Sequence, residues 1–197
     1  MKRIILASGS EARKNIVSSL GIPFEIMPAN IDEKSIINPD SAKRAELIAI
    51  AKAEKVANSI DEAIIISADT FCIYKSGKTL EKPEGLADAK EMLLLQSGSE
   101  DSILSGFCYI DKYINFRFSD TSVTTVKFRH FTEQEIDLYI QNMPVLTWSG
   151  AFYPGLPYGA SLVQEIKGSL TGFLYGLPTE ILISRLAKSG IGLSPKQ

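Results

Sequence analysis

The chain has 197 residues, of which 45% are hydrophobic and 22% are charged, as in an ordinary globular protein. This length is enough for one large domain with a real core, with or without two lobes. The formal net charge of −2 excludes nucleic-acid binding through the overall charge, so any anion site must be local.

No apolar run approaches the roughly 20 residues needed to cross a bilayer, and the run at the N-terminus is too short for a signal peptide. The cysteines, Cys72 and Cys108, are too few for a disulfide framework or a metal cluster. We interpret both as small buried hydrophobic residues. We therefore expect a cytoplasmic protein whose partners include neither a membrane nor a nucleic acid.

In the first half of the chain, short apolar segments alternate with helical patterns. Residues 3–7 and 63–67 are almost entirely apolar, which is typical of strands buried on both faces. The second of these strands is expected to end at Ala68-Asp69-Thr70. The expected order is a strand at 3–7, a helix at 10–20 ended by Gly21, a strand at 23–27, a helix at 41–59 and a strand at 63–67.

The second half is dominated by longer strands, which we expect to pair antiparallel. Thr132 and Glu135 form a capping-box pattern at the start of a helix. The expected elements are a hairpin at 71–80, a helix at 87–96, strands at 103–110 and 121–128, a helix from Thr132, a loop at 148–158, a strand at 160–166 and a helix from Pro178 to Gly190. This order predicts an α/β fold with a mixed sheet, flanking helices and two lobes around a central cleft.

Adjacent cations open the first helix. Arg13 and Lys14 follow Ser8-Gly9-Ser10 and lie in the first turn, where free backbone N–H groups and the helix dipole favour anions. Cations there are unfavourable for the helix itself, which is a hint that an anionic ligand compensates for them. The alternative is a solvated basic edge that binds nothing.

Two acidic positions are candidates for metal or water chemistry. Asp69 directly follows a buried strand, where a carboxylate suits a metal ligand or a general base. Its alternative role is to cap a turn with Thr70. Glu33 follows Asp32 in a loop, where paired acids are commonly just solvated.

Further cations complete the set of candidates. Lys52 lies in the middle of a helix, where its stem could simply cover apolar surface, and Lys82 precedes Pro83. Together the cations at 13, 14, 52 and 82 are suited to hold a polyphosphate, while Glu33 and Asp69 are suited to hold a divalent metal and activate water. That combination is typical of phosphoanhydride hydrolysis.

These residues resemble the Maf nucleotide pyrophosphatases over nearly the whole chain. Residues 5–14 are similar to the opening Ala-Ser-x-Ser-Pro-Arg-Arg of that family. The other matching segments follow in family order: Gly21-Ile22-Pro23-Phe24, Ile31-Asp32-Glu33, Ala51-Lys52-Ala53, Ala68-Asp69-Thr70, Lys82-Pro83, residues 123–128 and 135–139, Gly150-Ala151-Phe152 and Gly176-Leu177-Pro178.

The resemblance implies one elongated α/β domain over residues 1–197, similar to the inosine triphosphate pyrophosphatases. It implies hydrolysis of a nucleoside triphosphate, with pyrimidine or modified bases favoured, to the monophosphate and pyrophosphate. It also implies a divalent cation (Mg, Mn or Co) and a homodimer. By position in the family pattern, the resemblance implies that the phosphates are contacted by Ser8, Arg13, Lys14, Lys52 and Lys82. It implies that Glu33 and Asp69 bind the metal and the attacking water, and that the catalytic residues are Asp69, Glu33 and Lys82.

One segment departs from the family pattern. The family has Ala-Tyr-Gly-Ile-Gln-Gly, with an active-site Gln, whereas residues 151–159 are slightly longer and contain no Gln. The alternative hypothesis is therefore a catalytically impaired nucleotide-binding regulator of cell division on the same fold. Phe152, Tyr153 and Tyr158 are candidates to stack on a base, or else to pack the loop.

Overall fold

The computed structural model describes residues 2–193, which form a mixed α/β fold, as expected. The strands are β1 (Ile4–Leu6), β2 (Glu25–Ile26), β3 (Ile64–Ile73), β4 (Thr79–Leu80), β5 (Glu100–Asp111), β6 (Phe116–Phe128) and β7 (Val163–Lys167). The α-helices are α1 (Glu11–Ser19), α2 (Ser41–Ala57), α3 (Leu86–Gln96), α4 (Glu133–Asn142), α5 (Pro157–Ala160), α6 (Leu170–Tyr175) and α7 (Thr179–Lys188). Short 3₁₀ turns lie at η1 (Glu33–Ser35), η2 (Val145–Thr147) and η3 (Ser149–Ala151).

The sheet of the described residues has seven strands in the hydrogen-bonded order β2-β1-β3-β5-β6-β7, with β4 paired to β3. The chain divides into two compact units. The first unit runs to Thr70 and adds Ser105–Ser122 and the chain from Tyr175, whereas the second is Phe71–Leu104 with Val123–Leu174. The expected cleft between two lobes stays a prediction.

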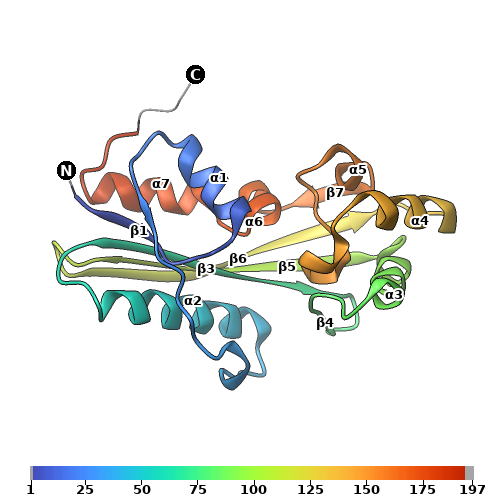
Figure 1. Ribbon diagram of the computed structural model, residues 1–197, viewed down its shortest axis with the longest axis horizontal. Helices are drawn as coiled ribbons and strands as arrows, with labels where there is room; N and C mark the ends of the chain where they lie inside the picture. Colours follow the sequence, from blue (N-terminus) through green and yellow to red (C-terminus); the bar gives the residue numbers. More distant parts are fainter. Residues whose placement is uncertain (1, 194–197) are drawn as a thin grey trace. The chain divides into compact units, whose positions relative to one another are not determined.

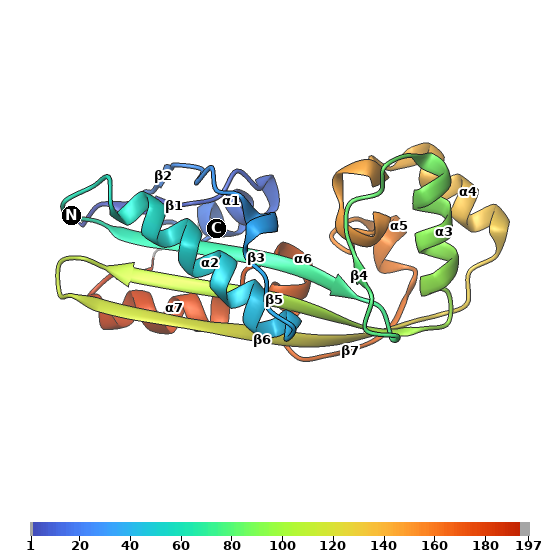
Figure 2. The same cartoon turned by 90° about the horizontal axis from the view of Figure 1, so that it is seen from below.

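In the first unit, helices cover both faces of the strands (Figures 1 and 2). β1 pairs in parallel with β2 and with β3. Alternate residues of β1 separate the two sides: Ile4 and Leu6 pack in a cluster with α1 and α7, whereas Ile5 packs in a cluster with α2. The same alternation divides Ile64 and Ile66 from Ile65 in β3. Burial on both faces is why these strands are apolar throughout.

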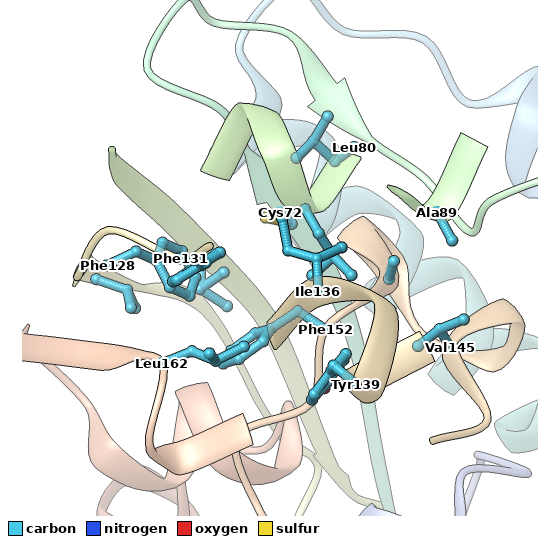
Figure 3. Packing of buried hydrophobic residues seen from close by; sticks show 14 of the residues in the cluster. Cys72, Leu80, Ala89, Phe128, Phe131, Ile136, Tyr139, Val145, Phe152 and Leu162 are labelled. Carbon is cyan, nitrogen blue, oxygen red and sulfur yellow. The ribbon is translucent and has the colours of Figure 1, made fainter. Parts of the chain in front are cut away.

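The second unit has its own aromatic core. Figure 3 shows Ile136 and Tyr139 of α4 in the same buried cluster as Phe152, whose ring meets that of Phe128 edge to face at 5.0 Å. Thr132 and Glu135 form the predicted capping box at the start of α4, so that prediction is confirmed.

Several predicted boundaries are wrong. The strand expected at 63–67 does not end at Ala68-Asp69-Thr70; β3 continues to Ile73, because this segment contains no Gly or Pro and its polar side chains find partners on both faces. The strand expected at 160–166 begins only at Val163, because Pro157 starts the short helix α5 inside the expected loop. Helix α6 was not predicted.

Both cysteines are buried, as expected. Burial raises the pKa of both thiols, that of Cys108 to about 12. Within residues 2–193, none of the helices combines the length and apolarity that a membrane span requires.

Candidate active site

The turn between β1 and α1 is organised by two serines. The Ser10 side chain caps α1 by accepting a hydrogen bond from the backbone N–H of Arg13 at 3.5 Å. Ser8 is buried, and its Oγ accepts from the backbone N–H of Ser10 at 3.3 Å and from Nη1 of Arg13 at 3.1 Å. The predicted helix start is confirmed, and it directs the Arg13 side chain back toward the turn.

Arg13 is not a solvated surface cation. Its guanidinium donates from Nη1 to Ser8, from Nη2 to Oγ1 of Thr70 at 2.9 Å, and from Nε to the carbonyl oxygen of Gly176 at 3.1 Å. Burial lowers the pKa of Arg13, while the nearby charges of Asp69 and Glu33 act to raise it. Arg13 is therefore held in one orientation and lies within electrostatic reach of both predicted acids.

Both predicted acids, Asp69 and Glu33, form ion pairs with the same lysine. Lys52 projects from α2, and its Nζ lies 2.7 Å from Oδ1 of Asp69 and 2.7 Å from Oε1 of Glu33. The side chains of Lys52 and Asp69 are only 11% and 8% exposed, whereas Glu33 at the start of η1 is 47% exposed. The second oxygen of Asp69, Oδ2, is buried without a hydrogen-bond partner. One carboxylate oxygen is thus available to a ligand that is not part of the chain.

Because side chains alternate along β3, the contacts of Lys52 and those of Arg13 lie on opposite faces of this strand. Ser67 donates its hydroxyl to the carbonyl of Ala49 in α2, and Asp69, two residues on, contacts Lys52 of the same helix. Thr70 contacts Arg13 on the opposite face. The pairing of β1 with β3 ends where the backbone N–H of Ala7 donates to the carbonyl oxygen of Ile66. Asp69 and Thr70 therefore lie just beyond the paired part of β3. The end of a parallel strand at such a point is a common place for a ligand.

Two predicted cations are not joined to this cluster. Lys14 is 43% exposed and pairs with Glu11 one helical turn earlier at 3.4 Å. Lys82 belongs to the second unit, where it is exposed two residues after the end of β4. In the part of the chain that the structure describes, no group of three or more His, Cys, Asp or Glu side chains is arranged to hold a metal ion.

The aromatic candidates in the second unit pack the loop. Phe152 is buried against Phe128, the ring of Tyr153 lies 5.2 Å from that of Trp148 in a tilted arrangement, and Tyr158 lies beside Tyr139. A cavity of about 390 Å³ in this unit is lined by residues between 154 and 174, which include none of the predicted site residues.

Thr70 and Gly176 are contacts of Arg13 that the sequence interpretation did not assign to the site. Both lie in segments that match the family pattern, but no role was given to either. Gly176 has φ of +62°, and a glycine held there before Leu177-Pro178 is the one signal that could have indicated a close approach of backbone and side chain.

Comparison with known proteins identifies the family of this chain. The sequence model of the family described as Maf-like protein matches residues 3–189. A dTTP/UTP pyrophosphatase of Alkaliphilus oremlandii is 36% identical over 180 residues, which are 90% of this chain and 91% of the relative. A dTTP/UTP pyrophosphatase of Bacillus cytotoxicus is 35% identical over 195 residues, which are 98% of this chain and 99% of the relative.

Among solved structures, the Staphylococcus aureus Ham1 protein superposes with a TM-score of 0.55, covering 95% of this chain and 100% of that one. The two share 13% sequence identity, so this likeness concerns the fold alone. With a family match over nearly all of its length and relatives at about 35% identity, the chain belongs to the Maf-like protein family, and the relatives it matches are nucleoside triphosphate pyrophosphatases.

Proposed function

We propose that this chain hydrolyses a nucleoside triphosphate to the monophosphate and pyrophosphate. The observation that carries the proposal is the cluster in which the buried Lys52 joins the buried Asp69 to the half-exposed Glu33 and leaves Oδ2 of Asp69 without a partner. A buried carboxylate with a free oxygen beside oriented cations is suited to take a proton from water that attacks a phosphate. The relatives named dTTP/UTP pyrophosphatase support the same chemistry.

The phosphates would be held at the start of α1. The backbone N–H groups of that helix turn and the guanidinium of Arg13 favour an anion at this place. Ser8 and the half-exposed Lys14 would add a hydroxyl and a mobile charge. Lys52 has one N–H left after its contacts with two carboxylates, and that donor would reach a phosphate oxygen.

Asp69 is proposed as the general base. Water attacks the α-phosphorus, its proton passes to the carboxylate of Asp69, and the bond from the α-phosphorus to the bridging oxygen breaks. The electron pair of that bond leaves with pyrophosphate. Lys52 fixes the direction of the Asp69 carboxylate through the hydrogen bond to Oδ1.

Glu33 and Asp69 fit a divalent cation such as Mg²⁺, Mn²⁺ or Co²⁺. Mg²⁺ is commonly held by one or two carboxylates together with substrate phosphates, and Oδ2 of Asp69 is an orphaned buried oxygen of the right kind. When bound, such a cation neutralises phosphate charge and lowers the pKa of a bound water.

Base preference and assembly are proposed on the relatives and the resemblance. The names of the relatives favour the pyrimidine triphosphates dTTP and UTP as first substrates, with modified nucleotides next. The catalytic role of Lys82, a single pyrophosphatase domain spanning both units, a homodimer and a cytoplasmic location stay predictions from the family pattern. The family match over residues 3–189 supports the single domain, because it includes segments of both units.

The test is pyrophosphate release from a panel of canonical and modified nucleoside triphosphates with Mg²⁺, Mn²⁺ or Co²⁺. Asp69→Asn is compared with Asp61→Asn, the same change at an exposed position of the first unit. We expect release from a few substrates, a loss of at least about a hundredfold in Asp69→Asn, and no loss in Asp61→Asn. Equal rates in the two variants would remove Asp69 from its role.

The second candidate function is nucleotide binding without turnover. It is favoured by one observation, the absence of Gln from residues 151–159. It predicts binding of the triphosphate by calorimetry and no pyrophosphate with any of the three metals. Release from even one nucleotide, abolished in Asp69→Asn, excludes it.

A further inference from the structure

Arg13 is held by uncharged oxygens alone in its three hydrogen bonds. The acceptors are a hydroxyl of Ser8, a hydroxyl of Thr70 and the backbone carbonyl of Gly176, which come from three separate segments of the first unit. Neutral acceptors fix the direction of a guanidinium without cancelling its charge, and they leave N–H donors for a further acceptor. An arginine bound to a carboxylate would instead have its charge offset before any ligand arrived.

Thr70 and Gly176 are linked to each other as well as to Arg13. The hydroxyl of Thr70 accepts from Nη2 of Arg13 at 2.9 Å and points its own hydrogen toward the carbonyl of Gly176 at 3.4 Å. The same carbonyl accepts from Nε of Arg13 at 3.1 Å. The three groups therefore form a closed ring of hydrogen bonds in which each fixes the direction of the others.

Gly176 leaves the space that this ring needs. Its φ of +62° lies in the left-handed region, which disfavours residues with a side chain. A Cβ at this position would lie 2.4 Å from Oγ1 of Thr70 and 3.2 Å from Nη2 of Arg13. A side chain at 176 is therefore excluded both by the backbone and by the two residues that its carbonyl contacts.

We propose that Thr70 and Gly176 are positioning residues, which hold the guanidinium of Arg13 ready for a phosphate of the triphosphate. This inference rests on the proposed function and deepens it. Holding the cation before the substrate binds removes the cost of ordering a long side chain during binding and reaction. A lysine could not replace Arg13, because its ammonium lacks the planar fork that meets three acceptors in different directions.

Thr70 and Asp69 are neighbours in β3, so one strand positions the contacts of both Arg13 and Lys52. Consecutive residues of a strand point to opposite faces, so Asp69 reaches Lys52 while Thr70 reaches Arg13. One rigid dipeptide of β3 thus sets the place of the general base and of the cation together. Any shift of β3 moves both groups, which keeps the base and the phosphate site in register.

The test is a double-mutant cycle on the full chain, with kcat and KM measured for the best substrate of the panel. Thr70→Val removes the hydroxyl and keeps the shape, Thr70→Ser keeps the hydroxyl, and Arg13→Ala removes the group that Thr70 is proposed to act through. We expect Thr70→Val to lower kcat/KM by at least about tenfold, and Thr70→Ser to retain wild-type kinetics. In the Arg13→Ala background, Thr70→Val should have almost no further effect.

Additive losses in the cycle, or an unchanged kcat/KM in Thr70→Val, would overturn the positioning role while leaving the proposed function intact. Thr70→Ala takes the place of Thr70→Val if the latter does not fold, as judged by circular dichroism. If the wild-type protein releases no pyrophosphate, the same cycle is run on the affinity for a triphosphate by calorimetry. A wild-type protein that neither hydrolyses nor binds a triphosphate overturns both proposals.

Discussion

Asp101 in β5 is a buried carboxylate whose burial should make the stability of the protein depend on pH. The residue is 1% exposed; its Oδ1 accepts a hydrogen bond from the Ser99 hydroxyl at 2.7 Å, while Oδ2 is buried without a partner. Burial raises the pKa of Asp101 from 3.8 to about 6, against the opposing effects of Ser99 and of Lys75. The folded protein therefore holds a proton on Asp101 that the unfolded chain has already lost.

The sign and size of the effect follow from this difference in pKa. Between pH 3.8 and about pH 6 the folded state binds more protons at Asp101 than the unfolded state does, so the free energy of unfolding falls as the pH rises. The shift from 3.8 to about 6 corresponds to about 3 kcal/mol, at ~1.4 kcal/mol per pKa unit. Above about pH 6, Asp101 is ionised in both states, so its contribution to the free energy of unfolding no longer changes with pH.

Asp101→Asn isolates this group, because the amide oxygen can still accept from Ser99 but the side chain does not titrate. Urea unfolding of both proteins is measured in steps from about pH 4 to about pH 7.5. Because this range begins close to the pKa of the unfolded chain, the free energy of unfolding of the wild-type protein should drop by about 2 kcal/mol more than that of Asp101→Asn. Parallel curves for the two proteins would refute the reasoning, since every other titrating group is common to both.

Three further predictions concern packing, thiol reactivity and capping. Gly106→Ala would place a Cβ 2.2 Å from the backbone carbonyl oxygen of Ala45, so we expect a loss of at least about 2 kcal/mol in urea unfolding, whereas Gly85→Ala, with open space around it, should lose far less. Both cysteines are buried with raised pKa values, so a thiol reagent should label them only at the rate of unfolding; fast labelling of the native protein would contradict this. Thr132→Ala removes the cap of α4 and should lower stability by about 1 kcal/mol in the same denaturation assay, with pyrophosphate release unchanged.

Local signals in the sequence were enough for much of the fold. The strands at the start of the chain and before Asp69 are apolar throughout because they are covered on both faces, and that pattern is visible without a structure. The helix starts at Ser10 and Thr132 were also readable, because a capping side chain bonds to a backbone group only two or three residues away.

Contacts between distant segments were not readable in the same way. Arg13 bonds to Gly176 across a sequence separation of 163 residues, and nothing in either segment alone indicates the other. Lys52 was equally consistent with a surface lysine, because only the tertiary structure places its ammonium between Asp69 and Glu33. The end of β3 was placed too early because polar residues in a strand resemble a loop until their partners on the two faces are known.

The formal charges of the candidate site bear on what it can bind. Lys52 is paired with both Asp69 and Glu33, and the charge of Arg13, which is not directly paired with either carboxylate, brings the sum over these four side chains to zero before Lys14 is counted. A triphosphate brings several negative charges, more than Lys14 and a helix N-terminus can match. The free oxygen of Asp69 and the exposed side of Glu33 are the places where further positive charge would be held against those phosphates. The arrangement is therefore better suited to a triphosphate that arrives with a divalent cation than to the free anion, and a neutral ligand would leave the remaining N–H donors of Arg13 without a charged acceptor.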